Sequence, residues 1–156
     1  MDAPTPVHDT FVVETTIDAA PSRVFGAYAD VRTREEWAAP GSDAIVYDKA
    51  DFRVGSGDTF RCGPKNDPRF NGAVVYHEIV QDRRFVFVES IRVGDQTLSL
   101  GMVTWELLPE GDRTRLQATT QMISFVGPQM VAGSKSGTQA AMNNLAAWLA
   151  RAPSRP

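Results

Sequence analysis

The chain has 156 residues, a length typical of one domain with a substantial core. Its formal net charge is −3 and its basic residues are scattered, so nothing in the composition favours binding to nucleic acid or to an anionic membrane. With one cysteine, Cys62, and two histidines, a disulfide framework is excluded and a Cys/His zinc site is not expected.

The sequence shows no targeting or cofactor signal. The first ten residues lack the basic and then apolar layout of a secretory signal, and no segment approaches the ~20 apolar residues of a membrane span. The glycines of residues 55–63 lack the strand–GxGxxG–helix context of a dinucleotide site. We therefore expect a cytoplasmic protein with no cofactor, no metal and no membrane span; its oligomeric state stays open, a homo-oligomer included.

The N-terminal part is expected to form an arm, a strand and two short helices. Residues 1–10 contain two prolines and little that could be buried, which predicts a flexible arm. Residues 11–17 are rich in β-branched and aromatic side chains, which predicts a strand. The apolar period then becomes helical over residues 18–30 and 32–41. We find no repeat and no linker, so residues 11–152 should form a single domain.

The middle of the chain predicts a run of further strands, separated by turn clusters rich in Gly, Pro and Asp. These strands are expected at residues 44–49, 58–63, 71–80, 84–93, 97–108 and 114–125. Short turns between successive strands indicate an antiparallel meander.

The C-terminal segment returns to helical spacing over residues 135–151. The Gly- and Ser-rich segment before it, residues 124–137, predicts a mobile gate at the start of this helix. One helix cannot cover both faces of so many strands. The sheet should therefore curl around the helix and leave a hollow between them.

A histidine and a carboxylate fall among apolar residues in two neighbouring strands. Alternation favours Val75, His77 and Ile79 as the inward side chains of one strand. In the next strand Phe87 and Glu89 share a face. Pairing across the turn would place His77 near Phe87 and within diagonal reach of Glu89. The pair could recognise a ligand, could act in catalysis, or could bind only water and backbone at the wet mouth of the sheet.

Four longer segments together resemble the START-like (SRPBCC) superfamily, in particular the branch named after an activator of a heat-shock-protein ATPase. They are TTIDAAPSRVFGAYADVRTREEW (15–37), VVYHEIVQDRRFVF (74–87), WELLPEGDRTRLQATTQ (105–121) and GSKSGTQAAMNNLAAWLA (133–150). The resemblance implies an α+β helix-grip (START/Bet v-like) fold. In this fold a curved antiparallel sheet surrounds a long C-terminal helix, two short helices follow the first strand, and an apolar cavity lies between sheet and helix.

This chain departs from the pattern of the resembling family at two positions. Glu89 stands where relatives usually carry an aromatic residue, and Thr120 stands where the AHSA-type branch often carries an acid. The cavity is therefore expected to stay polar in part while its recognition pattern differs.

Three functions follow as hypotheses. The first is binding of a small hydrophobic or aromatic molecule in the cavity, where the expected contacts are His77, Phe87, Glu89, Val103, Trp105, Thr120, Met122, Met142 and Leu145. The second is a cofactor-independent, polyketide-cyclase-like cyclase, dehydratase or lyase, with His77 as general base and Glu89 orienting it. The third is an interaction protein that resembles the chaperone ATPase activators. His77 and Glu89 are the only pair of groups that the sequence offers for this chemistry, which favours a binding protein over an enzyme.

Overall fold

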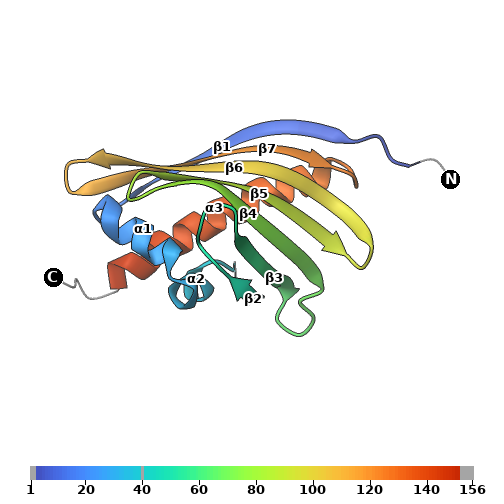
Figure 1. Ribbon diagram of the computed structural model, residues 1–156, viewed down its shortest axis with the longest axis horizontal. Helices are drawn as coiled ribbons and strands as arrows, with labels where there is room; N and C mark the ends of the chain where they lie inside the picture. The colour runs from blue at the N-terminus through green and yellow to red at the C-terminus, as the bar shows by residue number, and fades with distance from the viewer. Residues whose placement is uncertain (1–2, 40, 152–156) are drawn as a thin grey trace.

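A single curved antiparallel sheet folds over one long helix in the computed structural model, which describes residues 3–39 and 41–151 (Figure 1). The strands are β1 (Val7–Ile17), β2 (Asp43–Ala50), β3 (Gly57–Pro64), β4 (Phe70–Val80), β5 (Arg84–Val93), β6 (Gln96–Glu110) and β7 (Arg113–Ser124). The helices are α1 (Pro21–Ala29), α2 (Val31–Trp37) and α3 (Pro128–Arg151). The order of strands across the sheet is β1-β7-β6-β5-β4-β3-β2.

The predicted helix-grip architecture is confirmed, since two short helices follow the first strand and a meander leads to the long C-terminal helix. β1 closes the order by pairing with β7 along its whole length, from Val7 opposite Ser124 to Ile17 opposite Thr114. The strand thus includes residues 7–10 of the predicted arm. Residues 1, 2 and 152 of the predicted arm and domain lie outside the described residues.

Most of the segment predicted as a mobile gate, residues 124–137, is a helix rather than a loop, because α3 begins at Pro128. The mobility of the segment stays a prediction. Pro128 supplies a backbone already suited to a first helical turn. The sequence misled because Gly133, Ser134 and Gly137 are weak helix formers. Their place in the fold shows why small residues are used here, as described below.

One end of the space between sheet and helices is filled by aromatic side chains. Tyr28 of α1 lies with its ring centroid 4.1 Å from that of Phe85, and Phe85 stacks on Trp105 at 5.5 Å. Trp37 of α2 is buried, and its indole donates a hydrogen bond to the backbone carbonyl of Ala27 at 3.1 Å. The two short helices therefore close this end of the fold with a packed aromatic cluster.

The packing between β3 and β4 depends on a glycine, Gly72. Phe60 of β3 lies directly across from Gly72 of β4, and the Phe60 ring occupies the place where a Cβ on Gly72 would stand. Because Phe60 is buried, its ring can make room for such a Cβ only by leaving its packed position.

We expect Gly72→Ala to lower the free energy of unfolding by about 1–3 kcal/mol through this overpacking. Chemical denaturation of both proteins measures the difference. Gly26→Ala on the exposed face of α1 is the matched control, since an added Cβ there meets nothing. It should stabilise the protein by about 0.5–1 kcal/mol through helix propensity. Equal stability of Gly72→Ala and wild type would contradict the packing described here.

Candidate functional site

A cavity of about 580 Å³ lies between the concave face of the sheet, α2 and α3. This volume is within the range of roughly 300–1,000 Å³ that is usual for small-molecule sites. The side chains on the wall are mostly apolar and aromatic. They come from α1 and α2, from the strands β2 to β7 and from the first half of α3.

Small residues of α3 help to keep the cavity open. The residues of this helix that line it are Gln129, Met130, Gly133, Ser134, Gly137, Thr138 and Ala141, and most of them are small. A Cβ added at Gly133 or Gly137 would meet no atom within 4 Å. Gly133, Ser134 and Gly137, which made this segment resemble a loop in the sequence, therefore leave space between α3 and the sheet.

Glu89 reaches the cavity from the middle of β5. It lies between Phe87 and Ile91 on the inner face, with Val74 opposite it on β4 and Gly101 opposite it on β6. Among the described residues no side chain or backbone group forms a hydrogen bond or ion pair with its carboxyl group. Burial raises the pKa of Glu89 to about 7, because an ionised carboxylate loses its hydration there.

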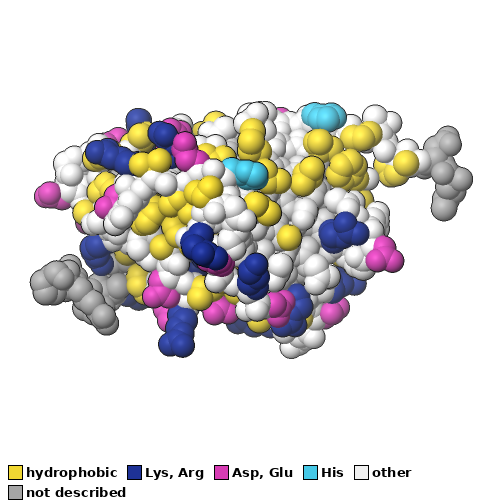
Figure 2. Space-filling view, viewed as in Figure 1, with side chains coloured by type: hydrophobic (Ala, Val, Ile, Leu, Met, Phe, Trp, Pro, Cys, Tyr) yellow, Lys and Arg dark blue, Asp and Glu magenta, His cyan; other side chains and the backbone are white. Residues whose placement is uncertain are grey.

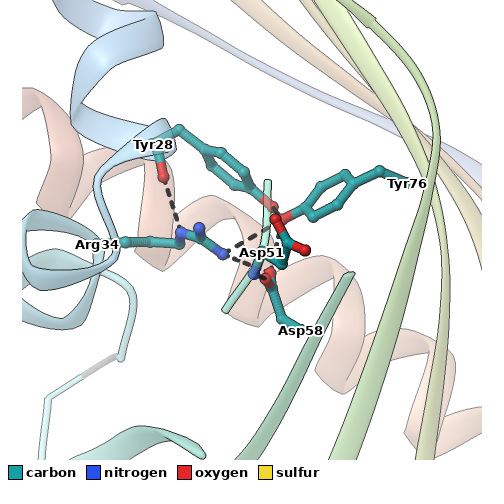
Figure 3. Close-up of polar contacts among 5 residues, drawn as sticks. All are labelled: Tyr28, Arg34, Asp51, Asp58 and Tyr76. Atoms are coloured by element: carbon teal, nitrogen blue, oxygen red, sulfur yellow. Dashed lines mark hydrogen bonds and ion pairs between the residues drawn. The ribbon is translucent and has the colours of Figure 1, made fainter. Parts of the chain in front are cut away.

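A buried ion pair lies at the end of the cavity nearest the short helices (Figure 3). Arg34 Nη1 lies 2.7 Å from Asp58 Oδ2, and both side chains are almost fully buried. The Tyr76 hydroxyl donates to the same carboxylate oxygen at 2.6 Å and lies 3.0 Å from the Tyr28 hydroxyl. Asp58 Oδ1 accepts from the backbone N–H of Asp51 at 3.1 Å. Both oxygens of the Asp58 carboxylate thus accept hydrogen bonds, and the donors are Arg34, Tyr76 and the backbone of Asp51.

The Arg34 guanidinium is also covered on its faces by aromatic rings. Its Cζ lies 4.3 Å from the ring centre of Tyr28 and 4.8 Å from that of Tyr47. Arg34 Nε donates to the backbone carbonyl of Tyr28 at 2.8 Å, while Nη2 is buried without a partner among the described residues. Stacking on two rings offsets part of the cost of burying this group.

The structure places six of the predicted contact residues on the cavity wall: Phe87, Glu89, Val103, Trp105, Thr120 and Met122. Two others, Met142 and Leu145, do not line it. Both are fully buried in the core on the side of α3 that packs toward the sheet, so the prediction that they contact the cavity is wrong.

The predicted inward position of His77 is also wrong. A β-bulge between Tyr76 and Glu78 makes His77 the extra residue of β4. On the N-terminal side of the bulge the faces are the reverse of those predicted: Tyr76 is fully buried, whereas Val75 is 44% exposed. His77 is exposed and is absent from the cavity wall, so it forms no pair with Glu89 and cannot act as the proposed base there.

The sequence reasoning missed the buried polar network. Charged residues of short helices are usually exposed, so the sequence gives little reason to expect Arg34 inside. Asp58 stands at the first position of the predicted strand 58–63, and the predicted inward set of Val75, His77 and Ile79 leaves Tyr76 outside. One signal was present: Arg34 precedes Trp37 by three residues, so the two share one face of α2, and a large aromatic residue indicates that this face is buried.

Charged side chains of both signs are interspersed over the face seen in Figure 2, in keeping with the small net charge. Within the described part of the chain, no helix combines the length and the apolar character needed to cross a membrane.

The fold and its cavity define a START-like protein of the helix-grip class. A family model described as "Activator of Hsp90 ATPase homolog 1-like protein" matches residues 18–150, and the chain belongs to this family. No curated protein matches the chain.

Three solved structures show how widely the fold is shared. The crystal structure of the Mll3558 protein from Rhizobium loti is 36% identical, with a TM-score of 0.82 over 92% of this chain and 99% of that chain. CalU16 from Micromonospora echinospora is 19% identical, with a TM-score of 0.65 over 92% and 78%. DynU16, of the dynemicin biosynthetic locus, is 20% identical, with a TM-score of 0.68 over 92% of this chain and 48% of that chain.

We expect Arg34→Met to destabilise the protein by about 3–5 kcal/mol, because it leaves the Asp58 carboxylate buried without its cation. Arg34→Met combined with Asp58→Asn should cost less than Arg34→Met alone, since the amide that replaces the carboxylate is neutral and its oxygen can still accept from Tyr76. A double-mutant cycle by chemical denaturation measures this coupling. Arg61→Met, which breaks an exposed pair with Asp48, should cost no more than about 1 kcal/mol. Additive losses at residues 34 and 58 would contradict the pairing.

Proposed function

We propose that this protein binds a small hydrophobic or aromatic molecule in the cavity between its sheet and α3. The observation that carries the proposal is an open volume of about 580 Å³ whose walls are mostly apolar. Side chains around an empty cavity lack van der Waals contacts on one side, and a bound ligand would supply those contacts.

The apolar wall is sufficient to support binding of useful strength. Burial of roughly 300 Å² of apolar ligand surface, at ~25 cal/mol per Å², contributes about 7 kcal/mol before the entropic costs of association. Because those costs are subtracted from this figure, micromolar affinity is the tightest binding to expect from the apolar wall alone.

The titratable side chains do not form the catalytic pair predicted from the sequence. His77 lies on the opposite face of the sheet from Glu89, so it cannot serve as the predicted base with Glu89 orienting it. Burial, with a contribution from nearby Glu89, raises the pKa of Cys62 to about 11, so its thiol is protonated and unreactive at neutral pH. Burial also raises the pKa of Tyr47 to about 12.

The chaperone-activator alternative comes from the description of the family. None of the contacts among the described residues bears on it, so it adds no second proposal.

Filling the cavity should abolish binding without harming the fold. We expect Gly137→Leu to reduce the affinity for Nile red, a neutral apolar dye, by at least about tenfold, because the new side chain occupies the hollow. Its melting temperature should be equal to or above that of wild type, since Leu is a better helix former than Gly. Fluorescence titration and thermal unfolding measure both effects.

Gly26→Leu is the matched control, because it makes the same change on an exposed helix face away from the cavity. It should bind the dye as wild type does. The proposal fails if wild type does not bind apolar probes, or if Gly137→Leu binds them as tightly as the control.

A further inference from the structure

The polar groups of the cavity wall are unevenly distributed around it. The wall positions contributed by β6, β7 and α3 carry no titratable side chain among the described residues. All the titratable groups lie on the other side: Tyr28, Arg34, Asp43, Tyr47, Asp58, Cys62 and Glu89. A ligand with one polar end would meet charge only on that side.

The charges on this side do not cancel. Arg34 and Asp58 neutralise each other through their direct contact. Asp43 and Glu89 have no ion-pair partner among the described residues. Tyr47 and Cys62 remain neutral at physiological pH, since burial raises their pKa values to about 12 and about 11. The surplus charge that the wall can present is therefore negative.

Arg34, the one cation that the described residues contribute to the wall, is not available to an anionic ligand. Arg34 uses Nε and Nη1 for bonds to Tyr28, Asp58 and Tyr76, and two aromatic rings cover the faces of its guanidinium. The remaining nitrogen, Nη2, is buried away from the accessible surface of the cavity. A carboxylate or phosphate inside the cavity would find no free cation, and it would lie near Asp43 and Glu89.

The aromatic side chains favour the same sign of ligand charge. Six aromatic residues besides Tyr28 line the cavity: Trp37, Tyr47, Phe60, Phe70, Phe87 and Trp105. Faces of such rings attract cations. The protein already uses this interaction, because the Arg34 guanidinium lies over the rings of Tyr28 and Tyr47.

We propose that the cavity selects hydrophobic molecules that carry a protonated amine, with the ammonium group bound to the Glu89 carboxylate and the apolar body against the aromatic wall. Gly101, directly across from Glu89 on β6, has no side chain that could cover the carboxylate, and both residues line the cavity. This inference rests on the proposed function, since it specifies the ligand class of the same cavity.

The Glu89 carboxylate has no partner among the described residues, so it gains from a ligand of opposite charge. Its raised pKa expresses the free-energy cost of an ionised Glu89 that has no counter-ion. A bound ammonium supplies that counter-ion and a charge-assisted hydrogen bond. A neutral hydroxyl would supply only an ordinary hydrogen bond, and an anion would add repulsion.

Three probes that differ only in their polar end test the inference: 6-phenylhexylamine, 6-phenylhexanol and 6-phenylhexanoate. Isothermal titration at pH 7.5 with wild type should show the amine binding about tenfold or more tightly than the alcohol, and the carboxylate binding most weakly. Glu89→Gln, which keeps the shape of the side chain, should lose the preference for the amine while its affinity for the alcohol changes by less than about threefold. Asp43→Asn is the control for general negative charge, and it should reduce the preference less than Glu89→Gln.

The outcomes separate this inference from the proposed function. If wild type binds the carboxylate as well as the amine, or if Glu89→Gln keeps the preference, the inference is overturned, while binding of the alcohol still supports an apolar cavity. If none of the three probes binds to wild type, both the inference and the proposed function are overturned. Unchanged alcohol binding by Glu89→Gln also shows that this variant is folded.

Discussion

The concave face of a seven-stranded sheet is too broad for one helix to fill, and this geometric constraint shapes the rest of the molecule. At one end, α1 and α2 insert an aromatic cluster built around Tyr28 and Phe85. At the other end α3 presents Gly133 and Gly137, which leave the space open. The fold therefore combines a packed half with a hollow half, and its stability and its proposed function reside in different places.

The buried pair of Arg34 and Asp58 marks the boundary between these halves. It connects α2 to β3, and through Tyr76 it reaches β4, so three elements that are distant in sequence meet at one carboxylate. Such a pair adds little net stability compared with an apolar replacement, but it is costly to break from one side. It therefore fixes the position of α2, whose Trp37 forms part of the cavity wall.

The sequence predicted elements well wherever polar and apolar residues alternate without interruption. The inner faces of β5, β6 and β7 follow this rule, so Phe87, Trp105 and Thr120 were placed correctly. In β4 the bulge at His77 inverts the alternation, and a bulge leaves no reliable trace in a single sequence.

Two further features required tertiary information. The first turns of α3 contain glycine and serine, and only their position against the cavity explains why a helix contains them. Arg34 is buried because Asp58 lies across from it, and that partner comes from a strand 24 residues away. Residue patterns report local periodicity, whereas these features depend on contacts between distant segments.

The ionisation of Glu89 in the free protein tests the central claim most directly, because it reports whether this carboxyl group lies in an enclosed and unpartnered place. Carbon-13 NMR of the glutamate carboxyl groups, followed against pH and assigned with Glu89→Gln, measures it. The structure predicts a pKa of about 7 for Glu89. A titration close to the ordinary value of 4.5 would show a solvated or paired carboxylate, and would contradict the open apolar cavity on which the account depends.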